Sequence, residues 1–388
     1  MDKINVGIIG TGFIGPAHVE ALRRLGFVDV VALAEANQEL ADKKAASLSI
    51  PCAYGDYRKM LERKDLVAVH NCTPNALHYE ITTDIIAAGK HVVSEKPLAM
   101  NSKESRDLVD LADKAGIANA IDFNYRFYPL IQHLRAMRIK GKLGAVYAVH
   151  GSYLQDWLFL DTDYNWRVEP EGGGESRAVG DVGSHWCDEI QYVTGLKIVR
   201  VYADLMTIHK TRKKPKFAIE TYAGKVLKPE DYEEKPIVTE DYATVLLEFD
   251  SGARGAFTVC QCAAGRKNRL YFEIDASKCA IAWDQEEPEE MWFGYREKPN
   301  EIMVKDAAFL EPEARPYAHY PGGHPEGYPD GPKNFFRNFY NFIREGKDPK
   351  KGEKDFATFL DGHHEILIVE AVLESQRTKK WVDVKYDR

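Results

Sequence analysis

Short apolar runs alternate with amphipathic segments over the first third of the chain, up to about residue 122. The runs predict strands, and the segments between them, whose apolar residues recur at helical spacing, predict helices. Strands that alternate with helices through short loops are typical of a doubly wound, mainly parallel α/β sheet with right-handed crossovers. The predicted strands are Ile4–Ile9, Val30–Ala34, Leu66–Asn71, His91–Ser94 and Ile117–Ile121, and the predicted helices are Phe13–Leu25, Glu39–Ser47, Ala76–Ala88 and Lys103–Ala115.

The rhythm changes near Gly144, beyond which apolar runs follow one another with only turns between most of them. This pattern predicts a second, mainly antiparallel sheet. Three helices accompany it, and the last two are expected to cover one face and leave the other open for a partner. The predicted strands are Ala145–Tyr153, Ile198–Ile208, Ala243–Phe249, Ala253–Gln261, Leu270–Asp275, Cys279–Trp283 and Trp381–Val384, and the helices are Val182–Val193, Lys333–Arg344 and Ala357–Ser375.

The 388 residues are therefore expected to form two domains. Residues 1–124 are predicted to be a Rossmann domain, and residues 125–388 an α+β domain with a large open-faced sheet. Lys210–Glu240, rich in charge and proline, is interpreted as an exposed excursion that buries little apolar surface. Tyr317–Gly331, dense in Gly, Pro, His and Tyr, is either a plain connector or a loop that faces a ligand.

Charge and composition narrow the class of protein. A formal net charge of -8 argues against general nucleic-acid binding, which needs a basic surface. The N-terminus enters a strand pattern at once, and no apolar run approaches the roughly 20 residues that span a bilayer, so a cytoplasmic protein is expected. The six cysteines form no CxxC pair, which predicts reduced thiols and no metal site.

A glycine-rich turn, Gly10-Thr11-Gly12-Phe13-Ile14-Gly15, joins the first predicted strand to the first helix. Gly10 permits the tight turn, Gly12 leaves room for a pyrophosphate, and Gly15 lets the helix pack close to the strand. The N–H groups at the start of the helix would then face the phosphates. Because the motif follows a strand and opens a helix, it predicts a dinucleotide site.

Glu35 ends the second predicted strand, where an acidic residue binds the ribose diol of a dinucleotide. A carboxylate there accepts hydrogen bonds from both hydroxyls and repels a 2′-phosphate, which indicates NAD over NADP. The alternatives are a solvated strand-end charge for Glu35, and admission of NADP by the nearby Lys43, Lys44 and Arg58.

Glu95-Lys96-Pro97 directly follows the fourth predicted strand. Open α/β sheets bind ligands at the C-terminal ends of their strands, so Lys96 is predicted to lie over the nicotinamide. A surface lysine before a loop proline is the alternative interpretation.

Asp181 and His185 lie four positions apart in GDVGSHWCDEI and are predicted to share a helix face. Capping by Asp181 and core packing of His185 would explain an isolated pair, but the neighbouring glycines 172–174 and 183 favour a ligand site. Oxidation of a secondary alcohol needs a base, for which His185 is suited, and a donor to the oxygen, for which Lys96 is suited. Asp181 is expected to orient a neighbour and bind a second hydroxyl.

Together these motifs resemble those of the Gfo/Idh/MocA oxidoreductases, the family of glucose–fructose oxidoreductase and inositol dehydrogenase. They occur in the family's order over about the first half of the chain, with one departure, Glu35, where many members carry aspartate. The matching elements are GIIGTGFIG, Thr73-Pro74-Asn75 with His78, Glu95-Lys96-Pro97, Asn124-Tyr125-Arg126-Phe127 and Asp181-Val182-Gly183-Ser184-His185.

The resemblance implies roles for residues that the patterns alone do not assign. It implies a Lys–Asp–His catalytic set, a cis peptide before Pro97, and dimers or tetramers formed through the open face of the C-terminal sheet. The cofactor residues that it implies beyond the glycine turn and Glu35 are Thr73, Asn75, His78, Glu95, Lys96 and Asn124.

Polar and aromatic side chains beside one another predict a sugar site in the second domain. Two segments, Gln155-Asp156-Trp157 and Tyr164-Asn165-Trp166-Arg167, combine them, and they resemble segments of family members of the levoglucosan type. A loop packed by its own aromatics is an equal alternative. The candidate substrate residues are Tyr125, Gln155, Trp166, Arg167, Asp181, His185 and His324.

The expected function is NAD-dependent hydride transfer at a secondary hydroxyl of a sugar, anhydrosugar or cyclic polyol. One alternative is a glycosidase or lyase that retains NAD and uses transient oxidation. The other is a nucleotide-sensing protein without catalysis, against which the intact set of Lys96, Asp181 and His185 argues.

Overall fold

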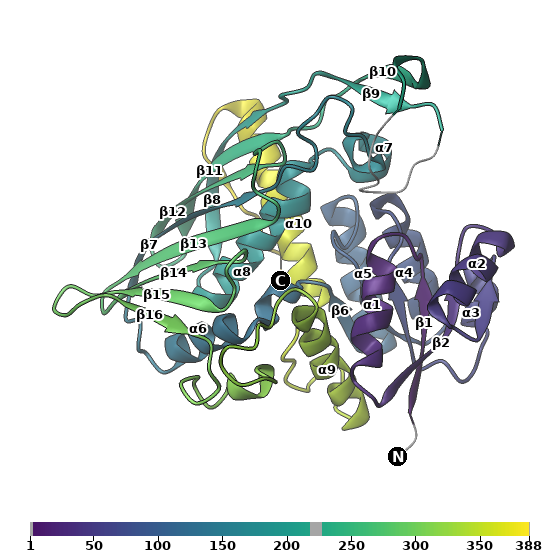
Figure 1. Ribbon diagram of the computed structural model, residues 1–388, viewed down its shortest axis with the longest axis horizontal. Coiled ribbons are helices and arrows are strands. Elements are labelled where there is room, and N and C mark those ends of the chain that lie inside the picture. Colours follow the sequence, from purple (N-terminus) through teal and green to yellow (C-terminus); the bar gives the residue numbers. More distant parts are fainter. Residues whose placement is uncertain (1–2, 218–226, 388) are drawn as a thin grey trace. The chain divides into compact units, whose positions relative to one another are not determined.

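The computed structural model describes residues 3–217 and 227–387 and divides the chain into two compact units (Figure 1). The first comprises residues 1–124 and 328–366, and the second residues 125–327 and 367–388. The change of unit at residue 124 lies where the sequence predicts it. Residues 328–366 belong with the first unit, however, and not with the second as the sequence analysis expects.

The first unit is built on a six-stranded parallel sheet in the order β3-β2-β1-β4-β5-β6. This is the strand order of the Rossmann fold, whose ligands bind where the order reverses, beside β1 and β4. The predicted doubly wound sheet is therefore confirmed. Its strands are β1 (Ile4–Ile9), β2 (Val28–Ala34), β3 (Cys52–Tyr54), β4 (Ala68–Asn71), β5 (His91–Ser94) and β6 (Asn119–Ile121).

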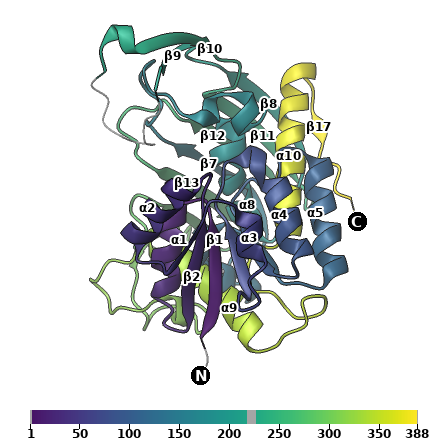
Figure 2. The same cartoon turned by 90° about the vertical axis from the view of Figure 1, so that its right-hand side faces the viewer.

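Helices pack in pairs within the first unit. Helix α4 lies beside α5 (Figure 2), and α1 lies beside α9. The sequence predicts α9 on the second sheet, so this expectation is wrong. The reason is an aromatic face of α9, on which Phe336 packs against the rings of His18 and His70 at centroid distances of 4.8 and 4.9 Å. The helices are α1 (Ile14–Arg23), α2 (Gln38–Leu48), α3 (Tyr57–Leu61), α4 (His78–Ala87), α5 (Ser102–Ala115) and α9 (Asp330–Arg344).

The second unit carries a nine-stranded sheet in the order β16-β15-β14-β13-β7-β12-β11-β8-β17. Neighbouring strands are antiparallel except β7 and β12, which run parallel, so the predicted mainly antiparallel sheet is confirmed. The strands are β7 (Val146–Leu154), β8 (Ile198–Met206), β11 (Tyr242–Phe249), β12 (Arg254–Cys260), β13 (Arg269–Ala276), β14 (Ala280–Asp284), β15 (Glu290–Gly294), β16 (Glu301–Val304) and β17 (Val382–Asp383).

The helices of the second unit position its polar residues. Helices α6 (Pro129–Ile139) and α8 (Ser184–Thr194) pack together, and α8 also contacts β7. The later half of α10 (Phe359–Thr378) holds β8, because the Ser375 hydroxyl accepts a hydrogen bond from the Ala203 N–H at 3.0 Å. None of the described helices is both long and apolar enough to cross a lipid bilayer.

The expected excursion at Lys210–Glu240 is only partly exposed. Strands β9 (Thr211–Pro215) and β10 (Tyr232–Pro236) form an antiparallel ribbon within it, and residues 218–226 lie outside the described part. Arg212 is completely buried, because its guanidinium bonds the Asp241 carboxylate at 2.7 Å and three backbone carbonyls. The charge density of this segment therefore reflects internal ion pairing as well as solvation.

The stability of the fold is expected to decrease in acid because of His133, which lies on α6. It is buried, and its Nδ1 accepts a hydrogen bond from the Glu311 N–H at 2.9 Å. Burial lowers the pKa of His133 from 6.5 to about 4. Since the unfolded chain binds this proton at the higher pH, the free energy of unfolding should fall by about 3 kcal/mol between about pH 7 and pH 4. His133→Gln should remove that part of the loss, measured as a smaller drop in Tm; an unchanged drop would contradict the assignment.

Candidate active site

The glycine turn before α1 has the shape of a phosphate cradle. Gly10 has φ +85°, and a Cβ there would lie 2.8 Å from the Cys72 carbonyl oxygen. A Cβ on Gly15 would lie 2.3 Å from the Gly10 oxygen, whereas one on Gly12 would meet no described atom within 4 Å. Helix α1, which begins at Ile14 after Phe13, has no side-chain cap and no acid in its first turn. The open flank at Gly12 and the uncapped helix end thus fit a dinucleotide pyrophosphate.

The Glu35 carboxylate lies over this turn. Its Oε1 accepts hydrogen bonds from the N–H and the hydroxyl of Thr11, each at 2.5 Å, and Oε2 accepts one from the Ala36 N–H at 3.3 Å. The carboxylate is therefore held at the end of β2, the position from which an acidic residue reaches a ribose diol.

Two alanine substitutions should separate the cofactor space from the packing of the turn. Gly12→Ala adds a methyl group only to the open flank, so the Tm without cofactor should stay within about 2 °C while NAD affinity falls roughly 10- to 100-fold. Gly15→Ala, whose methyl collides with the Gly10 carbonyl, should lower both the Tm and the affinity. NAD titration by fluorescence and thermal unfolding measure the two effects. Wild-type NAD affinity in Gly12→Ala would contradict this position of the pyrophosphate.

The His78 side chain forms hydrogen bonds with both loops that follow β4 and β5. Its Nδ1 lies 2.6 Å from the Pro97 carbonyl oxygen, and its Nε2 lies 2.8 Å from the Thr73 carbonyl oxygen. The ring is completely buried, and burial lowers its pKa. The Lys96–Pro97 peptide bond is cis, as predicted. The structure thus gives His78 a place beneath the cofactor loops, while direct contacts of Thr73, Asn75 and His78 with NAD remain predictions.

Glu95 belongs to a buried cluster that sequence reasoning missed. The Nε2 of His18 lies 2.9 Å from the Glu95 carboxylate and 3.1 Å from that of Asp122, and its Nδ1 lies 2.8 Å from His70. His70 in turn bonds the Tyr340 hydroxyl at 2.7 Å. These residues come from five separate segments, and no local motif joins them.

The cluster shifts the pKa values of its two carboxyl groups, Glu95 and Asp122, in opposite directions. Burial alone would raise the pKa of Glu95, but the hydrogen bond and charge of His18 hold it at about 2. Burial and the Glu95 charge raise the pKa of Asp122 to about 6. The ligand atoms of His18, Glu95 and Asp122 are close enough to hold a cation, but their mutual hydrogen bonds already account for the arrangement. Glu95 is therefore kept ionised beside Lys96.

Lys96 and Asn124 follow the C-terminal ends of β5 and β6, the end of a Rossmann sheet at which ligands bind. Lys96 is half-buried. Asn124 is buried, and its side-chain oxygen has no hydrogen-bond partner among the described residues. This orphaned acceptor suits a group that a bound nucleotide would bring.

Asp181 and His185 lie in the second unit, one turn apart. Asp181 is on a π turn, Val179–Gly183, that precedes α8, whereas the sequence predicts the α-helix itself from Val182. Ring contacts hold the largely buried His185, which meets Tyr125 edge-on at a centroid distance of 5.0 Å. Wide turns of this kind occur often at functional sites.

Tyr125 and Tyr153, whose rings contact His185, belong to a hydrogen-bonded group of aromatic and amide side chains. The hydroxyls of Tyr125 and Tyr153 lie 2.8 Å apart, and Asn268 bonds both of them, at 2.8 and 2.7 Å. Gln155 donates to the Asn268 oxygen at 2.8 Å. Tyr153 and Asn268 were not among the predicted residues, because neither stands in a recognisable motif.

In the same unit, the side chain of Arg167 stacks on the ring of Trp166. The Arg167 guanidinium lies 4.3 Å from the centroid of the Trp166 ring, and its Nε is 3.9 Å from Asp181 Oδ1. His324, by contrast, is exposed, and its carbonyl accepts a hydrogen bond from the buried Lys305 at 2.9 Å. Lys305 also pairs with Glu326 at 2.7 Å, so the loop around His324 has a fixed internal anchor.

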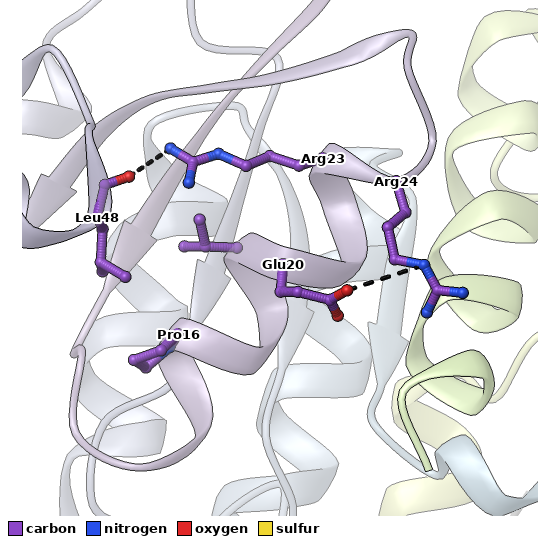
Figure 3. A pocket seen from close by; sticks show the side chains of 6 residues that line it. Pro16, Glu20, Arg23, Arg24 and Leu48 are labelled. Atoms are coloured by element: carbon purple, nitrogen blue, oxygen red, sulfur yellow. Dashed lines mark hydrogen bonds and ion pairs between the residues drawn. The ribbon is translucent and has the colours of Figure 1, made fainter. Parts of the chain in front are cut away.

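A separate groove of about 340 Å³ runs along α1 from Pro16 to Arg24 and is closed by Leu48 of α2 (Figure 3). Its arginines are already engaged: Arg23 bonds the carbonyls of Leu48 and Ser49 at the C-terminal end of α2, and Arg24 pairs with Glu20 and Asp330. Because both arginines are engaged within the protein, we assign the groove a structural role.

The predicted residues thus form two sets. The cofactor set, with Lys96, lies in the first unit, and the substrate set, with Asp181 and His185, lies in the second. Convergence of the two sets on one alcohol remains a prediction. The six cysteines are free, as predicted.

Models of known protein families match both parts of the chain. A model of an oxidoreductase family with an NAD-binding Rossmann fold matches residues 4–123, and a model of the GFO/IDH/MocA C-terminal domain matches residues 131–282. The levoglucosan dehydrogenase of Pseudarthrobacter phenanthrenivorans is 29% identical over 400 residues, which cover 99% of each chain.

Two solved structures are similar over nearly the whole chain. Levoglucosan dehydrogenase in complex with NADH and L-sorbose has a TM-score of 0.89 at 28% identity, with 100% of both chains covered. An inositol dehydrogenase homologue from Azotobacter vinelandii, complexed with NAD+, has a TM-score of 0.86 at 25% identity, covering 98% of this chain and 97% of its own.

Proposed function

Since the chain belongs to the Gfo/Idh/MocA family of NAD-binding oxidoreductases, we propose that it transfers a hydride between nicotinamide and a secondary hydroxyl of a sugar, anhydrosugar or cyclic polyol. It is a dehydrogenase that acts on CH–OH groups, and its cofactor is NAD. The observation that carries the substrate class is the group beside His185, in which the Tyr125 ring packs on the imidazole and amides bond the Tyr125 hydroxyl and the Asp181 carboxylate. Such a mixture suits the apolar face and the hydroxyls of a sugar ring.

The residues of the second unit can bind and deprotonate the alcohol. His185 is the general base that takes the hydroxyl proton, and Asp181 accepts a hydrogen bond from a second hydroxyl. Arg167, stacked on Trp166 beside Asp181, supplies further donors. Further hydrogen-bonding groups for the substrate come from the linked side chains of Gln155, Tyr125 and Asn268.

The residues of the first unit hold the cofactor and polarise the alcohol. The glycine turn takes the pyrophosphate, Glu35 the adenosine ribose, and Glu95 with Asn124 the nicotinamide side. NAD, when bound, supplies the hydride acceptor. Lys96 donates a hydrogen bond to the reacting oxygen and stabilises the negative charge that develops there.

The names of similar proteins support the choice of substrates to test. Levoglucosan dehydrogenase is among both the sequence relatives and the solved structures, and one of its structures contains L-sorbose. Purified protein with NAD should produce NADH with at least one member of a panel of pyranoses, anhydrosugars and cyclitols. Intact NAD binding without NADH formation on the whole panel would contradict the proposal. Glycoside cleavage without net NADH, with NAD retained through gel filtration, would instead indicate the redox-assisted glycosidase or lyase.

The outer face of the nine-stranded sheet supports a homo-oligomer. Exposed apolar side chains project from its strands, among them Met206, Leu246, Ile302 and Val304. A hollow of about 360 Å³ on β7, β12 and β13 is lined by His150, Thr258 and Tyr271, among others. A second copy of this chain would cover this face. Light scattering should therefore give a mass of two or four chains, and a monomer at micromolar concentration would contradict the pairing.

A further inference from the structure

A chain of buried polar side chains leads to Asp181 from the interior of the second unit. The Gln261 Nε2 donates to Asp181 Oδ2 at 2.8 Å, and Gln261 Oε1 accepts from the Arg177 guanidinium at 3.0 Å. Arg177 also pairs with Asp241 through a short hydrogen bond. Gln261 and Asp241 are completely buried, and Arg177 almost so. The residue proposed to touch the substrate is thus the outer end of an internal network.

The orientation of the Gln261 amide follows from its neighbours. A guanidinium has only donors, so the amide oxygen must face Arg177. The amide N–H group must then face Asp181, whose Oδ2 is thereby required to accept. This contact favours the ionised carboxylate and fixes one of its oxygens.

Charged groups hold Asp241, the inner end of this hydrogen-bonded network, in place. Burial alone would raise the pKa of Asp241, but Arg177 and Arg212 together hold it below its usual range. The second Asp241 oxygen accepts from the N–H groups of Ile208 and His209, at 2.7 and 3.1 Å. Arg177 cannot turn away from Gln261 without leaving a charge buried and unpaired, which is costly.

The backbone that carries Asp181 is fixed from the same side. The Glu240 Oε1 accepts from the Ser176 hydroxyl at 2.7 Å and from the N–H groups of Arg177 and Val179, at 3.0 and 2.9 Å. A remote carboxylate therefore caps the start of the π turn. Both the backbone and the side chain of Asp181 are held by the segment Glu240–Asp241 and its partners.

We propose that Gln261, supported by Arg177, is a positioning residue that sets the orientation and the ionised state of the Asp181 carboxylate. The inference rests on the proposed function, in which Asp181 binds a substrate hydroxyl. Gln261 touches no reacting atom and acts only through Asp181.

Gln261→Glu tests the role of the amide donor. The variant keeps the acceptor for Arg177 but places a second carboxylate oxygen against Asp181 Oδ2, so the pair must share one proton. We expect kcat to fall about 10- to 100-fold at pH 8 and to recover partly toward pH 6, whereas wild-type kcat falls in that direction as its base is protonated. NAD affinity should not change. A wild-type kcat and pH profile would overturn the inference.

Gln261→Met, with Gln132→Met as its matched control, separates positioning from stability. Gln132 is also a buried glutamine, and it donates to the Arg126 carbonyl at 2.6 Å and to the Tyr192 hydroxyl at 2.8 Å. Both variants should lose Tm, but only Gln261→Met should lose kcat, by about tenfold with NAD affinity unchanged. Equal kcat losses in the two variants would overturn the inference.

A thermal double-mutant cycle keeps the inference distinct from the proposed function. If the wild type oxidises no substrate, the proposed function fails, but the contact can still be measured without turnover. The Tm losses of Gln261→Met and Asp181→Ala should exceed, when summed, the loss of the double variant. Additive losses would show that the two side chains do not interact, and would overturn the inference independently of activity.

Discussion

Lys96→Met should lower kcat for sugar oxidation by about three orders of magnitude. Methionine matches the length of lysine but has no charge and no donor. The oxygen of the reacting alcohol would then develop negative charge without a partner, a loss felt in the transition state more than in binding. NAD affinity should change by no more than about tenfold, because at most one hydrogen bond to the ribose is lost.

Lys90→Met is the matched control for this substitution. Lys90 precedes β5 where Lys96 follows it, and its amine donates to the carbonyls of Arg63 and Leu66 at 2.8 and 2.9 Å. Burial lowers the pKa of Lys90. The two lysines thus flank the same strand, and neither is fully exposed. For Lys90→Met, thermal unfolding should show a lower Tm, while stopped-flow and steady-state NADH formation should show a normal kcat. Full turnover in Lys96→Met would remove Lys96 from the chemistry.

Much of the fold could be predicted because its signals are local. The strand and helix patterns up to Ile121 each depend on residues that are close together in the sequence. The same is true of the glycine turn and of the motif around Lys96. Strand β3 and helix α3 were missed because three and five residues are too short to show a period. Helix α6 was missed because Gln132 and His133 are buried together with the apolar residues around them, so its polar positions do not mark a solvent-facing side.

The missing parts of the site depend on long-range contacts. Gln261 bonds Asp181 across 80 positions, and Asn268 bonds Tyr125 across 143. His18 meets Asp122 across 104 positions. Gln261, Asn268, His18 and Asp122 stand in no motif that distinguishes them from ordinary core or loop residues. The same holds for the return of residues 328–366 to the first unit, which depends on the packing of α9 against α1.

His185→Ala should lower kcat by roughly 10²- to 10⁴-fold, the range expected when a general base is removed. Because the imidazole must be neutral to accept the hydroxyl proton, wild-type kcat/KM should fall as the pH drops. The variant should lose that acidic limb and keep only a shallow dependence on hydroxide. NAD affinity should be unchanged, since His185 and the glycine turn belong to different units.

Rescue and isotope effects distinguish a lost base from a damaged site. His185 is largely buried and packs on Tyr125, so its removal leaves space in which added imidazole can bind and accept the proton. Imidazole should therefore restore part of kcat in His185→Ala, in proportion to the neutral form of the added base. A substrate deuterated at the oxidised carbon should show a larger isotope effect in the variant, because the chemical step becomes slower than product release. An unaltered acidic limb without rescue would mean that another group takes the proton, and Lys96 would then be the residue to examine as the base.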